Sequence, residues 1–287
     1  MNDPKLQVDD YYRRHGHYGL IRDERETAFA AQCDLPLRDD QLPPVDIAAL
    51  PDSLGVASWM RIEDQLQIGS CQGHARTSAE ELAIYRETRG DTPQLNRMFA
   101  YLTSQQVDGI RGDSGSTISG GAEASRRFGS CLESLWPYTG HYATNIPANC
   151  FEDAKSRRLR FFKTLGNYDE VLRWLAHGLG GVVIGIAWNS SCEPDGQGRV
   201  ISYKSGGGGH ALALLDWNKR YVDAQRQPFI ELYNSWSTHW GAQGKAYIAP
   251  QVIETWCATQ TVIGYSDLDG PSIQPRSFDW LKGKVMA

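Results

Sequence analysis

Residues 64–90 read DQLQIGSCQGHARTSAEELAIYRETRG. From Cys71 onward, small and apolar side chains recur at the three- and four-residue spacing of a helix, at Ala75, Ala79, Leu82, Ala83 and Tyr85. The charged side chains fall at other positions of the pattern: Arg76, Glu80, Glu81 and Arg86. Gly90 ends the pattern. Gly69 and Ser70, just before Cys71, supply turn and capping chemistry at its start. The sequence therefore predicts a helix over residues 71–89 with the cysteine at or near its N-terminus.

The rest of the chain divides into a helical part and a β part. Further helical patterns are expected over residues 95–106, 118–128 and 167–178. After Gly180, short apolar runs alternate with Gly, Asn and Asp turns, which is typical of strands; they cover residues 181–188, 210–217, 229–236, 244–250 and 261–266. Helices followed by strands predict an α+β chain with two lobes.

Three polar residues stand out by their order and spacing. Cys71 begins the helix, His210 follows four glycines and opens a strand, and Asn234 lies in NSWSTHWG. Cysteine, histidine and asparagine in this order supply a nucleophile, a base and a side chain that orients the base. The cysteine and the histidine are 139 residues apart, within the roughly 130–150 expected of such a pair. A cysteine on a helix is most often a small buried apolar residue, so the other two residues are what point to chemistry.

Three segments resemble the papain family of cysteine peptidases, and its bacterial and phage-type members above all. They are DQLQIGSCQGHA (64–75), GGHALAL (208–214) and NSWSTHWGAQGKAYI (234–248), in the family's order. Weaker similarities are DSGSTISGGAEASRRFG and SLWPY. The resemblance spans about residues 42–265. It implies a papain-like two-lobe fold, with a helical lobe over about 52–165, an antiparallel β lobe over about 166–266, and the active cleft between them.

The resemblance also implies a role for each residue of the constellation. Cys71 at a helix N-terminus would feel the positive end of the helix dipole and face His210, and we expect both to lower its pKa. Its thiolate would attack a peptide carbonyl to form a thioester, and the imidazolium would protonate the leaving amine. Asn234 would accept a hydrogen bond from the other ring nitrogen of His210, shielded by Trp236. The Gln65 side chain and the Cys71 backbone N–H would bind the oxyanion.

The substrate of such an enzyme would be a protein or peptide. Gly115 and Ser116 stand where a Gly-Gly pair of the family pairs with the substrate backbone. By the same resemblance, Ala211 would line the neighbouring specificity pocket, Gly209 would offer its carbonyl oxygen, and Trp240 would border the leaving-group side. The expected substrate-binding residues are therefore Gly115, Ser116, Gly209, Ala211, Trp236 and Trp240.

Three positions near the nucleophile depart from the family pattern. Ile68 stands where a disulfide cysteine would be, Gln72 replaces an aromatic residue, and His74 stands where phenylalanine is usual. His74 lies one helical turn beyond Cys71, where a side chain points along the helix and not over the thiol. We therefore expect it to be a core or partnered histidine and not a rival base.

Composition argues against several other classes of protein. The chain has 287 residues, with 29 basic against 34 acidic ones and a net charge of −5, which argues against a nucleic-acid partner. It has no apolar run of the roughly 20 residues that span a membrane, and no apolar secretory signal at its start. The six cysteines include no CxxC pair, which argues against a zinc site made mainly of cysteines. We expect neither metal nor cofactor. These features predict a cytoplasmic protein, or one delivered without a signal peptide, in a reducing environment.

The two ends of the chain lie outside the expected peptidase domain, residues 43–266. Residues 1–42 are polar, precede a proline-rich boundary, and parallel the short leader of bacterial relatives. They either occlude the cleft as a propeptide and autoinhibit the enzyme, or pack as an ordinary extension. Residues 267–287 are a C-terminal extension beyond the resemblance.

Two other functions stay open at the level of sequence. One is a non-catalytic papain-fold module with a structural or binding role, against which the presence of Cys71, His210, Asn234 and Gln65 argues. The other is a Cys-His amidase or transferase acting on non-protein amide bonds, because acyl transfer to a thiol is the same first step.

Overall fold

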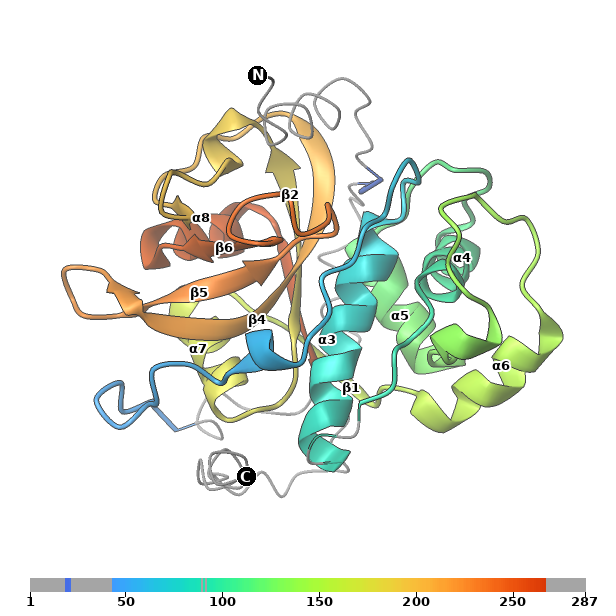
Figure 1. Ribbon diagram of the computed structural model, residues 1–287, viewed down its shortest axis with the longest axis horizontal. Helices are drawn as coiled ribbons and strands as arrows, with labels where there is room; N and C mark the ends of the chain where they lie inside the picture. Colours follow the sequence, from blue (N-terminus) through green and yellow to red (C-terminus); the bar gives the residue numbers. More distant parts are fainter. Residues whose placement is uncertain (1–18, 22–42, 89, 91, 267–287) are drawn as a thin grey trace.

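A computed structural model describes residues 19–21, 43–88, 90 and 92–266. The long helix α3 (Cys71–Thr88) lies in the middle of the molecule, with a seven-stranded sheet on one side of it (Figure 1). On its other side lie α4 (Arg97–Asp108), α5 (Ile118–Phe128) and α6 (Ala148–Ala154). The helix packs against both the sheet and α4. This two-lobe arrangement confirms the predicted α+β fold class.

The sheet has the strand order β1-β7-β2-β4-β5-β6-β3, and its neighbouring strands are antiparallel except for β3 and β6. The strands are β1 (Phe161–Thr164), β2 (Val182–Trp188), β3 (Arg199–Val200), β4 (Gly208–Val222), β5 (Pro228–Tyr233), β6 (Lys245–Ile248) and β7 (Thr261–Ser266). All seven residues of β2 are buried, which explains its continuous apolar sequence. The largest apolar core lies between the sheet and the helices that cover it.

Most elements expected from the sequence are present. The helices predicted over 71–89, 95–106, 118–128 and 167–178 correspond to α3, α4, α5 and α7 (Tyr168–Ala176). The five predicted strands correspond to β2, β4, β5, β6 and β7. Their ends differ by a few residues, and β4 extends well beyond the predicted 210–217.

Two elements depart from the simple division into a helical part and a β part. Strand β1 pairs with β7, so one edge of the sheet comes from the stretch that the sequence assigned to the helical lobe. Helix α8 (Pro250–Thr259) lies between β6 and β7 and was not expected. Its signals are a proline at the first helical position and buried residues at helical spacing, Val252, Ile253 and Trp256.

The charged residues of α3 do not form a solvent-exposed face, as an amphipathic surface helix would require. The helix lies between the two lobes, so even Arg76 and Glu80 are buried, with side chains 0% and 2% exposed. Arg76 Nε donates to Glu80 Oε1 over 2.7 Å, and its Nη2 donates to the carbonyl oxygen of Gly129 over 2.7 Å. Ser125 and Ser130 hydroxyls donate to the same carboxylate. The buried charges are therefore paired and hydrogen-bonded, as burial requires.

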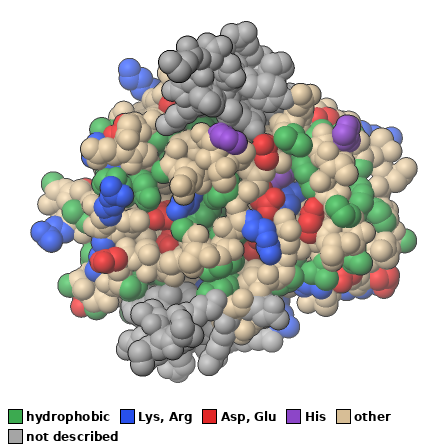
Figure 2. All heavy atoms as spheres, viewed as in Figure 1, with side chains coloured by type: hydrophobic (Ala, Val, Ile, Leu, Met, Phe, Trp, Pro, Cys, Tyr) green, Lys and Arg blue, Asp and Glu red, His purple; other side chains and the backbone are tan. Residues whose placement is uncertain are grey.

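The surface carries charge of both signs. On the face shown in Figure 2, acidic and basic side chains of the described residues lie interspersed. Among the described helices, none combines the length and apolar character needed to cross a membrane.

Replacing Arg76 with alanine should lower the free energy of unfolding by roughly 3–5 kcal/mol, because the Glu80 carboxylate would stay buried without its cation. Arg126→Ala is the matched control, since that guanidinium is 51% exposed and pairs with Glu123 on the same helix. It should cost about 0–1 kcal/mol. Urea unfolding followed by circular dichroism measures both, and equal losses would contradict a structural role for the buried pair.

Candidate active site

Cys71 is the first residue of α3, and its side chain is fully buried. The loop before it is held from both lobes. The backbone N–H of Gln65 donates to the carbonyl oxygen of Ser235 over 2.9 Å. The hydroxyl of Tyr138 donates to the carbonyl oxygen of Gln65 over 2.9 Å and lies 2.9 Å from Ser70 Oγ. These contacts fix the helix N-terminus at the junction of the lobes.

His210 lies near the start of β4, and Asn234 directly follows β5. The Nε2 atom of His210 is 2.8 Å from Asn234 Oδ1. The backbone N–H of Ser235 donates to the same oxygen over 2.8 Å, which identifies that atom as the acceptor. Nε2 therefore carries a proton, and in the neutral ring Nδ1 is the basic nitrogen.

The sulfur of Cys71 lies beside the same strand. The backbones of Ala211, the residue after His210, and of Gly19 and Gln72 lie close enough to the thiol to lower its pKa. Backbone N–H groups are the donors that favour a thiolate. Ala211 therefore brings the strand that carries the histidine beside the first turn of α3.

Indole rings cover the histidine. Trp236 stacks on His210 with ring centroids 4.5 Å apart and an angle of 22° between the planes. Trp188 meets the imidazole edge-on, with centroids 5.4 Å apart. Trp240 lies in a second layer, 2% exposed and packed edge-on against Trp188 and Trp236. Its place at the leaving-group side of the site stays a prediction.

The side chain of Gln65 is oriented by its neighbours. Ser235 Oγ donates to Gln65 Oε1 over 2.7 Å, and Gln65 Nε2 donates to the carbonyl oxygen of Ile68 over 2.9 Å. Because a hydroxyl donor fixes the oxygen end of the amide, the nitrogen end with its two N–H groups is fixed as well. The donor end of the Gln65 side chain therefore points along the loop that leads into Cys71, where it bonds Ile68.

A piece of the N-terminal segment lies along the residues predicted to bind substrate. The backbone N–H of Ser116 donates to the carbonyl oxygen of Gly19 over 2.8 Å, and Ile21 N–H donates to the Ser116 carbonyl over 3.0 Å. Leu20 N–H donates to the carbonyl oxygen of Gly209 over 3.1 Å. The bridge between Leu20 and Ser116 is parallel. These two cleft residues thus bind an extended backbone in the structure itself.

Glycines at two cleft positions permit this close approach. A Cβ atom on Gly115, whose φ is 82°, would lie 2.0 Å from the carbonyl oxygen of Gly19. A Cβ on Gly209 would lie 2.3 Å from the carbonyl oxygen of Leu20. Both distances are impossible for real side chains, so any larger residue would displace the bound backbone.

The partly buried side chain of Leu20 packs against the main apolar core. Gly185 lies on β2 opposite Ala211 of β4, and a Cβ at position 185 would lie 2.6 Å from Leu20 Cδ2. The same Cβ would lie 2.8 Å from Ile118 Cγ1. The absence of a side chain at this position therefore makes the room that the leucine fills.

Burial sets the protonation of the thiol and the imidazole. It raises the pKa of Cys71 to about 11, although nearby backbone N–H groups act to lower it. Burial lowers the pKa of His210 to about 4, although the bond to Asn234 favours the charged ring. At neutral pH both groups are uncharged. The expectation of a lowered cysteine pKa is therefore wrong for this covered state, because the fully buried thiol has no water to solvate its thiolate.

His74 is a partnered histidine, as the sequence predicts. Its Nδ1 atom lies 3.0 Å from the carbonyl oxygen of Ser70, and its ring meets Tyr138 edge-on. Burial, reinforced by the Arg97 guanidinium, lowers its pKa to about 3, so the ring is neutral. Within the described ranges, no group of three or more His, Cys, Asp and Glu side chains is placed to hold a metal ion.

Sequence reasoning missed three contributors to this site. Ser235 had a signal in its position in the chain, between the predicted site residues Asn234 and Trp236. Tyr138 belongs to the WPY turn, but its bond to the loop before Cys71 spans 73 residues and leaves no local signature. Leu20 gave no signal at all.

Comparisons with known proteins show the family and the fold. A family model described as papain family cysteine protease matches residues 52–265. Xylellain, a cysteine protease from Xylella fastidiosa, superposes with a TM-score of 0.68 at 20% identity, over 88% of this chain and 97% of that one. The bromelain protease from Ananas comosus, in complex with the E64 inhibitor, superposes with a TM-score of 0.60 at 15% identity, over 76% of this chain and 99% of that one. Digestive procathepsin L 3 of Tenebrio molitor superposes with a TM-score of 0.60 at 16% identity, over 91% of this chain and 90% of that one. No curated protein is significantly similar in sequence.

A thiol with a pKa near 11 is ionised in about one molecule in 10,000 at pH 7. We therefore expect iodoacetamide to alkylate Cys71 of the full chain slowly at pH 7, with a rate that climbs steadily through pH 9. Peptide mapping against a Cys71→Ala variant identifies the modified residue. A rate that is already flat between pH 5 and pH 9 would contradict a neutral thiol in the covered state.

Proposed function

Because the chain belongs to the papain family of cysteine proteases and is a cysteine peptidase, we propose that Cys71 is its nucleophile, with His210 as base and Asn234 as the orienting residue. The observation that carries this proposal is the 2.8 Å hydrogen bond from His210 Nε2 to Asn234 Oδ1. It leaves Nδ1 as the basic nitrogen of the neutral ring, and the backbone of the next residue, Ala211, lies close enough to the thiol to lower its pKa.

The proposed reaction proceeds in two halves. His210 Nδ1 takes the proton from Cys71 Sγ, and the sulfur attacks the carbonyl carbon of the scissile bond. The negative charge moves to the carbonyl oxygen, which the Gln65 Nε2–H and the Cys71 backbone N–H bind. The C–N bond then breaks as the imidazolium gives its proton to the leaving amine, and a thioester remains. Water, deprotonated by the same imidazole, hydrolyses the thioester and restores the thiol.

We propose that the substrate is an extended peptide with an apolar side chain in the pocket beside Gly185. The contacts of Gly19, Leu20 and Ile21 support this, since Ser116 and Gly209 bind their backbone groups and the pocket takes a leucine. Strand-like pairing of a peptide with an enzyme supplies affinity through the main chain, and a side-chain pocket supplies specificity.

We propose further that residues 1–42 are autoinhibitory; of these, the structure describes only Gly19, Leu20 and Ile21. They lie on Ser116 and Gly209, the residues assigned above to substrate. The segment presents a backbone N–H of Gly19 to the sulfur, where a substrate must present a carbonyl carbon. It therefore blocks the cleft without being positioned for attack.

The first test is labelling with a peptidyl vinyl sulfone that carries leucine at the second residue from the warhead. We expect modification at Cys71 and no modification of the Cys71→Ala variant.

Gln65→Ala should lower kcat for peptide hydrolysis by about 100- to 1000-fold, because it removes one oxyanion donor. Gln67→Ala, an exposed residue of the same loop, is the matched control and should leave kcat unchanged.

Two results would contradict this assignment. Slow labelling spread over several cysteines, in the full chain and in one lacking residues 1–42, would favour a non-catalytic module. Labelling of Cys71 without hydrolysis of any peptide, but with release of products from muropeptides, would favour an amidase on non-protein bonds.

The second test is Leu20→Asp in the full-length chain. An aspartate is costly in an apolar pocket, so the segment should leave the cleft and the rate of vinyl sulfone labelling should rise about tenfold or more. Ile201→Asp is the matched control, because that apolar side chain is 51% exposed. If Leu20→Asp reacts no faster than the unaltered chain, residues 1–42 are not an inhibitor.

A further inference from the structure

A buried tyrosine on α4 holds the cleft residue Gly115. The hydroxyl of Tyr101 accepts a hydrogen bond from the backbone N–H of Gly115 over 2.8 Å, and Gln105 Nε2 lies 3.1 Å from the same oxygen. It donates in turn to Asp113 Oδ1 over 2.9 Å. Tyr101 is fully buried, and burial together with the Asp113 carboxylate raises its pKa above the ordinary value. The phenol therefore stays protonated and keeps its bond to the carboxylate.

The same carboxylate reaches the loop that leads into the nucleophile. Asp113 Oδ1 accepts a hydrogen bond from the backbone N–H of Gly69 over 2.9 Å. Gly69 stands two residues before Cys71. One oxygen atom thus joins Tyr101, and through it Gly115, to the N-terminus of α3.

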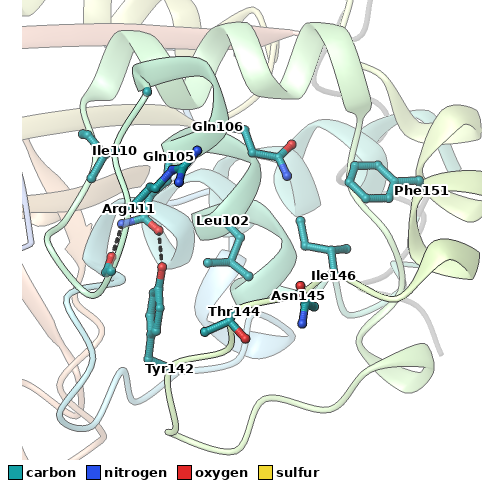
Figure 3. Close-up of a pocket in the computed structure, with 12 residues that line it drawn as sticks. Leu102, Gln105, Gln106, Ile110, Arg111, Tyr142, Thr144, Asn145, Ile146 and Phe151 are labelled. Atoms are coloured by element: carbon teal, nitrogen blue, oxygen red, sulfur yellow. Dashed lines mark hydrogen bonds between the residues drawn. The ribbon is translucent and has the colours of Figure 1, made fainter.

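Gln105 completes the network one helical turn after Tyr101. Its Nε2 atom donates to the carbonyl oxygens of Gly112 and Gly115 over 2.8 and 2.9 Å. Its Oε1 accepts from the hydroxyl of Tyr142 over 3.0 Å. Figure 3 shows Gln105 and Tyr142 meeting at the wall of a hollow of about 720 Å³ on the helical lobe. Both polar groups of the Gly115 backbone are therefore held by side chains of α4.

This arrangement matters because Ser116, the next residue, contributes a single bridge to an extended backbone in the cleft. No longer strand fixes its position, since the segment between α4 and α5 contains no strand of the sheet. Ser116 Oγ donates to Gln72 Oε1 over 3.3 Å, and Asp108 Oδ2 accepts from the backbone N–H of Thr117 over 2.8 Å. The position of the Ser116 backbone relative to Cys71 depends in addition on what holds Gly115 and Gly69. The network of Tyr101, Gln105 and Asp113 holds both.

We propose that Tyr101 and Gln105, acting through Asp113, are positioning residues that set the substrate-binding backbone of Gly115 and Ser116 at a fixed distance from the nucleophile. This inference rests on the proposed function. It makes a distinct claim: loss of the network weakens reactions that use the backbone of Ser116 and spares the intrinsic reactivity of the thiol.

The test compares two reagents on full-length chains carrying Leu20→Asp, with and without Tyr101→Phe. The leucine-containing vinyl sulfone extends to Ser116, whereas iodoacetamide is too small to reach it. Tyr101→Phe should slow the peptidyl reagent about tenfold, the effect of about 1.4 kcal/mol, and change the iodoacetamide rate less than twofold. Tyr168→Phe is the matched control, because it removes a buried hydroxyl bonded to the Pro228 carbonyl in the other lobe. It should change neither rate.

A second readout does not depend on activity. Amide hydrogen exchange of Gly115 and Ser116 in the otherwise unaltered full chain should speed up at least about tenfold in Tyr101→Phe and in Asp113→Ala. Asp113→Asn keeps an acceptor oxygen at the same place and should restore most of the protection.

The outcomes separate this inference from the proposed function. The positioning role would be overturned if Tyr101→Phe slowed both reagents equally, or slowed neither, and left the amide hydrogen exchange of Gly115 and Ser116 unchanged. If the chain without Tyr101→Phe fails to react with the vinyl sulfone, the proposed function fails. The exchange measurement then decides alone whether the network holds the backbone of Gly115 and Ser116.

Discussion

The constraint on which the rest depends is the contact between the first turn of α3 and strand β4. The sulfur of Cys71 meets the backbone of Ala211 there, so the helix and the sheet are joined at the atom that the proposed chemistry uses. The register of the sheet follows from the same point. Gly185 pairs with Ala211 and Ile186 with His210, which sets the leucine pocket beside the proposed base. A shift of one residue in that pairing would turn every side chain of β4 to the opposite face.

Burial at this junction stabilises the fold and opposes the chemistry. A fully buried thiol and imidazole stay neutral, with pKa values near 11 and 4, whereas the proposed mechanism needs charge to move between them. The N-terminal segment contributes to this burial, because the backbone of Gly19 contacts the sulfur. Removing the segment would admit water and polar substrate groups, and both effects favour ionisation. The segment can therefore block the cleft and, by burying the thiol, oppose its ionisation, although the backbone N–H of Gly19 itself acts in the opposite direction.

The sequence predicts the local parts of this structure well and the long-range parts poorly. Helix α3 begins at Cys71 because its spacing pattern and the Gly-Ser turn before it are contained in one short stretch. The order and spacing of Cys71, His210 and Asn234 were also visible in the chain. The burial of Arg76 and Glu80 was not, since it depends on α4 and α5 covering the far side of the helix. Strand β1 joins the sheet through β7, about 100 residues later in the chain, and no local pattern encodes that partner.

The network around Tyr101 shows why such sites need more than their reacting residues. Gly69 and Asp113 are 44 residues apart, and each belongs to a loop that would be free to move if it depended on its own backbone. Tyr101 and Gln105 lie one turn apart on a rigid helix, so their side chains point the same way and hold the loop of Asp113, which in turn holds Gly69. A hydrogen bond from a side chain on a rigid helix fixes the position of the loop atom that it binds. Fixing two loops through one carboxylate oxygen also fixes the distance between them, which is the quantity that attack on a bound carbonyl depends on.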